Sequence, residues 1–352
     1  MLGLLLTSNA YMVSPIARPA LAVQRTNPIA MQAPAALVAA PPDGYTGAVA
    51  AGKAKAGMSP TQIFGRGILS GCHIGFGAYL MLTVGAACPG LAATNPGLQK
   101  IILGAFGLPF GLFMTLMTGA ELFTGNTALV SMAAYEGEAT TDQVAKSWVM
   151  SYLGNFVGSV GLAFLVSVGA TLVGGGASVG IAGAKTSLPF MKAFVRGILC
   201  NWLVCMAVWM ATSADDIASK AAAVWFPVCG FAATGLDHSV ANMFLIPFGM
   251  LQGADISVGD FVFKNLIPAT LGNIVGGALC VAGVYKAAYG KPAVAAVHAP
   301  GAPVAVEQNE GGPGPFWWMS GSAPQVQQKP AGVELEHDAQ RSKWSKGIPA
   351  LA

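Results

Sequence analysis

Charged residues are scarce in this chain. Asp, Glu, Lys and Arg make up 9% of its 352 residues, whereas hydrophobic residues make up 54%. Soluble domains carry roughly 25% charged residues, so the composition excludes an ordinary soluble protein and indicates a membrane protein. The formal net charge of +3 is too small and too scattered to indicate a nucleic-acid partner.

Cysteine, although present six times, forms no pattern that suits a zinc site. Cys200 and Cys205 are five residues apart in an apolar stretch, where thiols behave as small hydrophobic side chains. The apolar core also lacks a nucleophile–base pair, a metal cluster and a cofactor motif. We therefore expect no metal and no cofactor, and we exclude an intramembrane enzyme.

Acidic residues are missing from the first 42 positions, where Arg18 and Arg25 are the only charges. Ala, Pro and Ser are abundant there, and this composition resembles an organelle transit peptide; the alternative is an uncleaved disordered tail. We therefore predict a transit peptide over 1–45, a linker over 46–60 and a membrane domain over 61–289. Residues 290–352 are rich in Pro, Gly, Gln and Ala and read as a disordered tail.

Six long apolar stretches fill the membrane domain, and a spanning helix needs about 20 such residues. The stretches are 63–87, 98–134, 147–174, 188–211, 218–252 and 259–288. The second and fifth are too long for single straight helices, and each contains Thr-Gly followed by an acid near its middle. Glycine and small polar residues favour a backbone break there. The expected fold class is thus an all-α membrane protein with six transmembrane helices, of which spans 2 and 5 are broken.

Three motifs occur twice, in the same order. RGIL recurs at 66–69 and 196–199, TGAE at 118–121 is matched by TGLD at 234–237, and LGN at 153–155 recurs at 271–273. Lys146 and Lys264 each precede the LGN asparagine by nine residues. With three spans in each copy (about 61–175 and 188–289), the second copy enters the membrane from the opposite face. Such an inverted repeat of three spans is typical of transport proteins whose site lies near the bilayer midplane.

The first break covers GAELFTGN at 119–126, and its backbone cannot stay unpaired in lipid. Thr124 and Asn126 can cap the half-helix that follows. The N-terminus of that half-helix would favour an anion. The alternative is a kinked helix in which Thr and Asn satisfy only each other.

The second break contains His238 and, four residues later, Asn242. An ionisable side chain inside a span is a functional hypothesis by default. The imidazole could neutralise an anion as imidazolium, or it could supply a proton that turns the anion into its neutral acid; the second route suits anions of weak acids. Glu121 and Asp237 are expected to accept hydrogen bonds from free N–H groups at the breaks, with a proton-relay role as the alternative.

Three segments together resemble the formate/nitrite transporter family: GAELFTGN at 119–126, CNWLVCMA at 200–207, and the segment DHSVANM at 237–243. The resemblance covers about 60–290. It implies an aquaporin-like helical fold and a homopentamer with one pore in each protomer. Family members pass formate, nitrite, hydrosulfide, lactate or bicarbonate, and the N-terminal extension resembles the green-algal chloroplast-envelope branch.

The resemblance also implies roles for individual pore residues. One apolar constriction would consist of Leu122, Phe123 and Val204, and the other of Leu108, Leu112 and Phe231. His238 and Thr124 would lie between the two, with Asn201 near the inner one. Lys185 would stand at the outer vestibule. The family often has phenylalanine at the position of Leu108, so that constriction is expected to be wider here.

These observations predict a multi-pass transporter of a small monovalent weak-acid anion in the chloroplast inner envelope membrane. Nitrite is the favoured substrate, by analogy with plastid nitrogen assimilation. Transport of bicarbonate or formate is the close alternative, and a channel for neutral solutes is the second alternative. The expected partners are the anion, the lipid bilayer and further copies of the chain in a homopentamer, without nucleic acid.

Overall fold

The computed structural model describes residues 38–169 and 175–291 of the chain. The predicted tail over 290–352, apart from its first residues, and all but the last residues of the predicted transit peptide lie outside these ranges. The described part is helical, apart from an isolated bridge between Val38 and Ala214.

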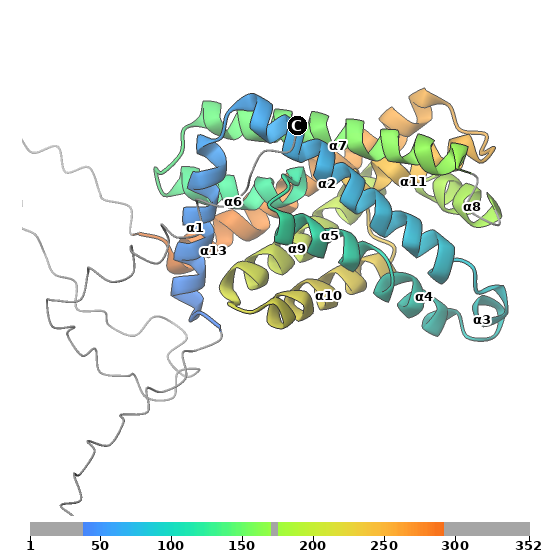
Figure 1. Ribbon diagram of the computed structural model, residues 1–352, viewed down its shortest axis with the longest axis horizontal. Helices are drawn as coiled ribbons and strands as arrows, with labels where there is room; N and C mark the ends of the chain where they lie inside the picture. The colour runs from blue at the N-terminus through green and yellow to red at the C-terminus, as the bar shows by residue number, and fades with distance from the viewer. Residues whose placement is uncertain (1–37, 170–174, 292–352) are drawn as a thin grey trace, which may run out of the picture. The chain divides into compact units, whose positions relative to one another are not determined.

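The first half of the described chain runs from α1 to α7 (Figure 1). Its elements are α1 (Pro41–Gly57), α2 (Pro60–Leu80) with the π-helical turn η1 (Met81–Gly85), α3 (Pro89–Thr94), α4 (Pro96–Ala105), α5 (Leu108–Thr118), α6 (Phe123–Tyr135) and α7 (Thr141–Val168). Two helices begin with a capping box: Ser59 and Gln62 start α2, and Thr140 and Gln143 start α7. Most of the segment 46–60, expected to be a linker, lies in α1.

The second half runs from α8 to α13. Its elements are α8 (Gly175–Thr186), α9 (Phe190–Ser213), α10 (Ile217–Ala233), α11 (Ser239–Leu251), η2 (Asp260–Leu266), α12 (Ile267–Ile274), η3 (Val275–Gly283) and α13 (Val284–Tyr289). The last four follow one another without a break and form one long helix with two π-helical stretches.

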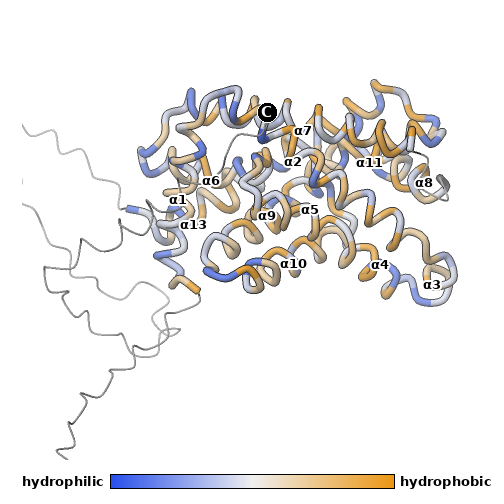
Figure 2. Tube along the Cα trace, viewed as in Figure 1, coloured by the Kyte–Doolittle hydropathy of each residue, from blue (hydrophilic) through white to orange (hydrophobic). Residues whose placement is uncertain are grey.

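Five helices in the described residues are long and apolar enough to cross a membrane: Pro60–Gly85, Pro96–Thr118, Thr141–Val168, Phe190–Ser213 and Asp260–Tyr289. The predicted fifth span instead consists of two shorter apolar helices, α10 and α11. Figure 2 shows hydrophobic residues along α4 and α10 and hydrophilic residues at helix ends and connecting turns. This distribution suits helices whose sides face lipid and whose ends face water.

The short helices α6 and α11 occupy the centre. All residues of α6 from Phe123 to Ala133 are buried, as are all of α11 from Ser239 to Ile246. Helices that are buried on every side need apolar or internally bonded residues all round. The breaks at the start of α6 and α11 are therefore placed deep inside the protein.

Glycine lets the surrounding helices approach closely. A Cβ at Gly154 on α7 would collide with the carbonyl oxygen of Phe64 on α2, and a Cβ at Gly272 on α12 would collide with that of Phe194 on α9. The pairs α2–α7 and α9–α12 pack along each other for this reason. They carry the two RGIL motifs and the two LGN motifs that the sequence repeats.

Candidate functional site

The chain leaves helical geometry at both predicted breaks. Helix α5 ends at Thr118 and α6 begins at Phe123, and the turn between them places Gly119 at a φ of 70°. Helix α10 ends at Ala233 and α11 begins at Ser239, with Gly235 at a φ of 74°. Only glycine adopts this left-handed conformation without steric cost, which explains the Thr-Gly in both motifs.

One asparagine satisfies the open backbone at the first break. Asn155, on α7, accepts a hydrogen bond from the Phe123 N–H at 2.9 Å through Oδ1. Its Nδ2 donates to the carbonyl oxygens of Gly67, at 2.8 Å, and Glu121, at 2.9 Å. The side chain therefore joins α2, the break and the start of α6.

A second asparagine makes the same set of contacts at the second break. Asn273, on α12, accepts from the Ser239 N–H at 2.8 Å and donates to the carbonyl oxygens of Gly197, at 2.9 Å, and Asp237, at 3.0 Å. These are the positions that the repeated motifs pair with Phe123, Gly67 and Glu121. The repeated motifs thus mark residues that stabilise the two non-helical breaks through the same set of hydrogen bonds.

His238 lies where the two breaks meet. Its Nε2 is 2.9 Å from Thr124 Oγ1, and its Nδ1 accepts the Ala241 N–H at 3.0 Å, which caps α11. Because a backbone N–H only donates, the neutral ring carries its proton on Nε2. The ring also stacks on Phe231, with centroids 5.8 Å apart. Nε2–H can therefore donate a hydrogen bond to Thr124 or to a solute beside it.

A small apolar cavity of about 10 Å³ lies against His238. It is lined by His238 and seven apolar residues: Ile74, Leu108, Leu112, Leu122, Val204, Val228 and Phe231. A cavity of this volume holds one water molecule at most. A hydrated anion does not fit, so any ion that enters must lose its water.

A much larger cavity of about 430 Å³, here called the α8-side vestibule, shares Leu108, Phe231 and His238 with the small cavity. Its wall includes Lys100 from α4, Lys185 from α8 and Arg196 from α9. His238 therefore borders both cavities, as do Leu108 and Phe231.

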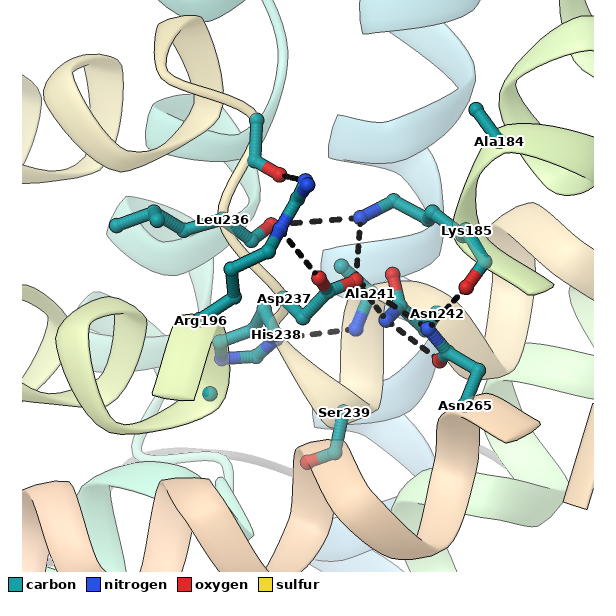
Figure 3. A network of polar contacts seen from close by, with 12 residues as sticks. Ala184, Lys185, Arg196, Leu236, Asp237, His238, Ser239, Ala241, Asn242 and Asn265 are labelled. Atoms are coloured by element: carbon teal, nitrogen blue, oxygen red, sulfur yellow. Dashed lines mark hydrogen bonds and ion pairs between the residues drawn. The ribbon is translucent and has the colours of Figure 1, made fainter. Parts of the chain in front are cut away.

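Asp237 is fully buried behind this vestibule and holds two cations (Figure 3). Lys185 Nζ is 2.9 Å from Oδ1, and Arg196 Nε is 2.8 Å from Oδ2. Arg196 also donates to the carbonyl oxygen of Gly235. Side-chain amides of Asn242, at 3.0 Å, and Asn265, at 3.3 Å, donate to Oδ1. Burying a carboxylate without such partners is costly, so the cations and amides together hold this break in place.

Glu121, buried at the first break, has a corresponding set of partners. Lys55 of α1 pairs with Oε1 at 2.7 Å, and the Asn126 amide donates to Oε2 at 2.8 Å. The lysine comes from α1, the first helix of the first half, as Lys185 comes from α8, the first helix of the second half. The sequence pattern did not point to Lys55 as a site residue, because nothing local links α1 to a residue 66 positions later.

The structure brings together most of the residues that the sequence assigned to a pore. Thr124 contacts His238 directly, and Asn201 donates to the Thr124 carbonyl oxygen at 3.2 Å. Five of the six predicted constriction residues line the small cavity: Leu122, Val204, Leu108, Leu112 and Phe231. Phe123 is buried elsewhere, edge-on to Tyr152 with ring centroids 5.0 Å apart.

Two local expectations are wrong. Thr124 and Asn126 do not cap α6, because its first N–H group finds Asn155 instead and the N-cap Leu122 has no capping side chain. Glu121 and Asp237 accept hydrogen bonds and ion pairs from side chains, rather than from backbone N–H groups at the breaks. At α6, a side chain from α7 takes the place of the expected cap. At Glu121 and Asp237, side chains take the place of the expected backbone N–H groups, and most of them come from distant helices.

The family model of the formate/nitrite transporters matches residues 43–287. A probable formate transporter of Methanothermobacter thermautotrophicus is 41% identical over 241 residues, which are 63% of this chain and 86% of that protein. The formate channel FocA of Haemophilus influenzae is 36% identical over 255 residues, 66% of this chain and 88% of its own.

Solved structures have the same fold. That of an FNT family ion channel aligns with a TM-score of 0.64 and 30% identity over 70% of this chain and 98% of its own. A pentameric formate channel with formate bound aligns with a TM-score of 0.60 and 30% identity, over 66% of this chain and 98% of its own.

Long apolar helices, breaks that meet at a buried imidazole and a narrow cavity beside it define a multi-pass membrane transport protein, not an enzyme. The chain belongs to the formate/nitrite transporter family.

Proposed function

We propose that the protein passes a small monovalent weak-acid anion, with nitrite as the favoured substrate, through a pore centred on His238. The observation that carries this proposal is the position of the imidazole, which borders both the α8-side vestibule and the small apolar cavity. A solute must pass this ring to go from one to the other. The ring therefore lies where a permeating anion has lost most of its water.

A weak-acid anion can pass this point because it need not remain charged. An unpaired ion in an apolar site costs many kcal/mol, and a group in that position takes up a proton instead. Lys185 and Arg196 would concentrate the anion in the vestibule. At the constriction, Nε2–H would donate a hydrogen bond while the anion shares a proton drawn from vestibule water. Protonating the ring itself at Nδ1 would break its bond to the Ala241 N–H, so the neutral ring is the favoured form.

The matched breaks support an inverted repeat of three spans. In this proposal α10 and α11 together make the fifth of six crossings, as α4, α5 and α6 make the second. Asn155 and Asn273 would be equivalent residues about the repeat axis, which follows from their identical contacts. We further propose a homopentamer, with one pore in each protomer, by analogy with the pentameric formate channel.

Nitrite and formate are both consistent with the family, and bicarbonate is also a small weak-acid anion. The preference for nitrite rests on the proposed location in the chloroplast inner envelope, where nitrite would serve nitrogen assimilation. Proteoliposomes containing the purified protein should take up nitrite faster than bicarbonate. Bicarbonate uptake without nitrite uptake would overturn this choice.

The decisive variant is His238→Phe, which keeps an aromatic ring but removes the donor. Anion flux should fall about tenfold or more, whereas a neutral-solute channel would keep its flux. His238→Gln, which retains an N–H donor, is the matched control and should keep more flux than the Phe variant. Full anion flux in a well-folded Phe variant would refute the role of His238.

A further inference from the structure

Leu108 and Phe231 line both cavities, and the two cavities differ greatly in volume. The vestibule holds about 430 Å³, whereas the cavity beyond holds about 10 Å³. Pockets of roughly 300–1,000 Å³ take whole organic molecules. The vestibule is therefore far larger than a nitrite or formate ion requires, and a larger anion could enter it but not leave through the constriction.

The charge on the vestibule wall is strongly one-sided. Lys100, Lys185 and Arg196 line it, and no carboxylate does so within the described part of the chain. Asp237 lies behind the wall, fully buried, and offsets one of the three positive charges. The charged groups around the cavity therefore sum to about two positive charges, which one monovalent anion does not balance.

The two paired cations keep hydrogen-bonding capacity to spare. Lys185 Nζ donates to Asp237 and to the Leu236 carbonyl oxygen, so one of its three N–H bonds remains. Arg196 uses Nε toward Asp237 and one terminal nitrogen toward the Gly235 carbonyl oxygen. Its other terminal nitrogen remains available for a carboxylate, and Lys100 is exposed to solvent.

We propose that the α8-side vestibule is a binding site for an organic polycarboxylate that cannot pass the constriction. Such a ligand places its carboxylates against Lys100, Lys185 and Arg196 and plugs the entrance. It therefore inhibits transport competitively, and only from the α8 side of the membrane. This inference rests on the proposed function for its effect on flux, whereas binding itself does not depend on transport.

The first half of the chain supplies a matched control for Arg196. Arg66 occupies the equivalent place in the RGIL motif, but it is exposed and its side chain contacts Met58 Sδ at 3.4 Å rather than a carboxylate. Arg66 does not line the vestibule. Arg66→Gln therefore removes the same charge from the equivalent helix position without altering the proposed site.

The probe is citrate, tested on the full chain reconstituted in one orientation in proteoliposomes, with citrate either outside the vesicles or trapped inside them. Formate flux should be blocked by citrate on one face of the membrane and not on the other. The inhibition constant should rise about tenfold in Lys100→Gln and Arg196→Gln and stay unchanged in Arg66→Gln. Arg196→Gln removes a partner of buried Asp237, so Lys100→Gln, which leaves that network intact, keeps the test valid if the Arg196 variant unfolds.

Calorimetric titration of the same purified proteins with citrate separates the two hypotheses. Binding that weakens in Lys100→Gln supports the site even if no anion is transported, in which case only the proposed function fails. Normal formate flux without citrate binding overturns the inference and leaves the proposed function standing. Equal block from both faces, or block that Lys100→Gln does not weaken, also overturns it.

Discussion

His238 uses its two ring nitrogens for different tasks. Nδ1 caps helix α11 by accepting the Ala241 N–H, and Nε2 faces Thr124. The cap fixes the tautomer, and the tautomer makes Nε2, the nitrogen that faces Thr124, a hydrogen-bond donor. The function proposed for this residue therefore depends on a backbone contact three positions away as much as on the imidazole itself.

Thr124→Val tests the partner of this ring. Valine has nearly the same shape, so the packing is preserved, but Nε2–H loses its hydrogen-bond partner in a fully buried place. We expect anion flux to fall about tenfold and stability to fall by about 1–3 kcal/mol. Uptake in proteoliposomes and thermal unfolding in detergent measure the two effects. Thr118→Val is the control, because that hydroxyl bonds only within its own exposed helix turn; equal flux in both variants would remove Thr124 from the mechanism.

The two broken elements depend on side chains from the long helices around them. Asn155 and Asn273 each bind one N–H and one carbonyl group at a break, where no helix satisfies them, and each also donates to a carbonyl oxygen of a neighbouring helix. The hydrocarbon core of a membrane contains no water that could form hydrogen bonds with such groups. The long helices therefore act as hydrogen-bonding partners for the breaks in addition to packing against them.

Asn273→Ala should destabilise the protein by more than an ordinary cap substitution. It leaves the Ser239 N–H and the Asp237 carbonyl oxygen unpaired in the interior and removes a hydrogen bond to the Gly197 carbonyl oxygen, at a cost of several kcal/mol. Asn95→Ala is the comparison, since Asn95 caps only the Leu98 N–H at the exposed start of α4 and should cost about 1 kcal/mol. Thermal unfolding of the two purified variants measures both losses of stability. Similar losses in the two variants would contradict the role proposed for Asn273.

Helix α1 is attached to the end of the described chain through Glu136. Tyr45 of α1 and Lys286 of α13 each donate to Glu136 Oε1 at 2.9 Å. Burial alone would raise the pKa of Glu136, but the hydrogen bonds from Lys286 and Tyr45 outweigh it and hold the pKa below its ordinary value of 4.5. A carboxylate with a depressed pKa stabilises the fold above pH 4.5, and this contribution is lost as the pH falls below that value.

Glu136→Gln should therefore loosen α1 at neutral pH. We expect the protection of the amides of residues 41–57 against hydrogen exchange, taken relative to the intrinsic exchange rate at the same pH, to fall about tenfold, as it should in the unmodified protein at pH below 4.5. Glu138→Gln is the control, because its pair with Lys53 is exposed and contributes little. Unchanged exchange in the Glu136→Gln variant would show that α1 is held by packing alone.

On the scale of the whole molecule, α1 belongs with the transport domain. Its buried face includes Tyr45 and Ala48, and Lys55 supplies the partner of Glu121. A boundary at residue 45 would cut the first turns of α1 and remove Tyr45 from Glu136. A segment that serves only for targeting would therefore end before Pro41, where α1 begins.

Removal of residues 1–37 tests the proposed location. The shortened chain should transport anions in proteoliposomes at the rate of the full chain, because the proposed pore residues and the contacts that the structure describes for them lie beyond the cut. In algal cells, a fluorescent fusion of the shortened chain should fail to reach the plastid. Delivery of that fusion to the plastid would refute a targeting role for the N-terminal segment, whereas loss of transport in vesicles would assign it to the transport domain.

The sequence by itself determined the apolar helices and the positions of both breaks, and it pointed to His238 as a candidate site residue. These follow from local properties: hydropathy sets helix length, Thr-Gly marks a left-handed turn, and an imidazole inside a span is rare. The repeated motifs also pointed to Asn155 and Asn273 before their contacts were known. The sequence left the partners of each break undetermined.

Only the tertiary structure decided those partners. It placed Arg196 and Lys185 on Asp237 and Lys55 on Glu121, gave the capping of α6 to Asn155, and buried Phe123 against Tyr152 instead of the cavity. A side chain in a crowded interior bonds to whichever group packing brings within reach, and these groups lie tens of residues away along the chain. A local sequence pattern does not show which distant groups meet, because these contacts depend on how closely glycine lets the helices approach.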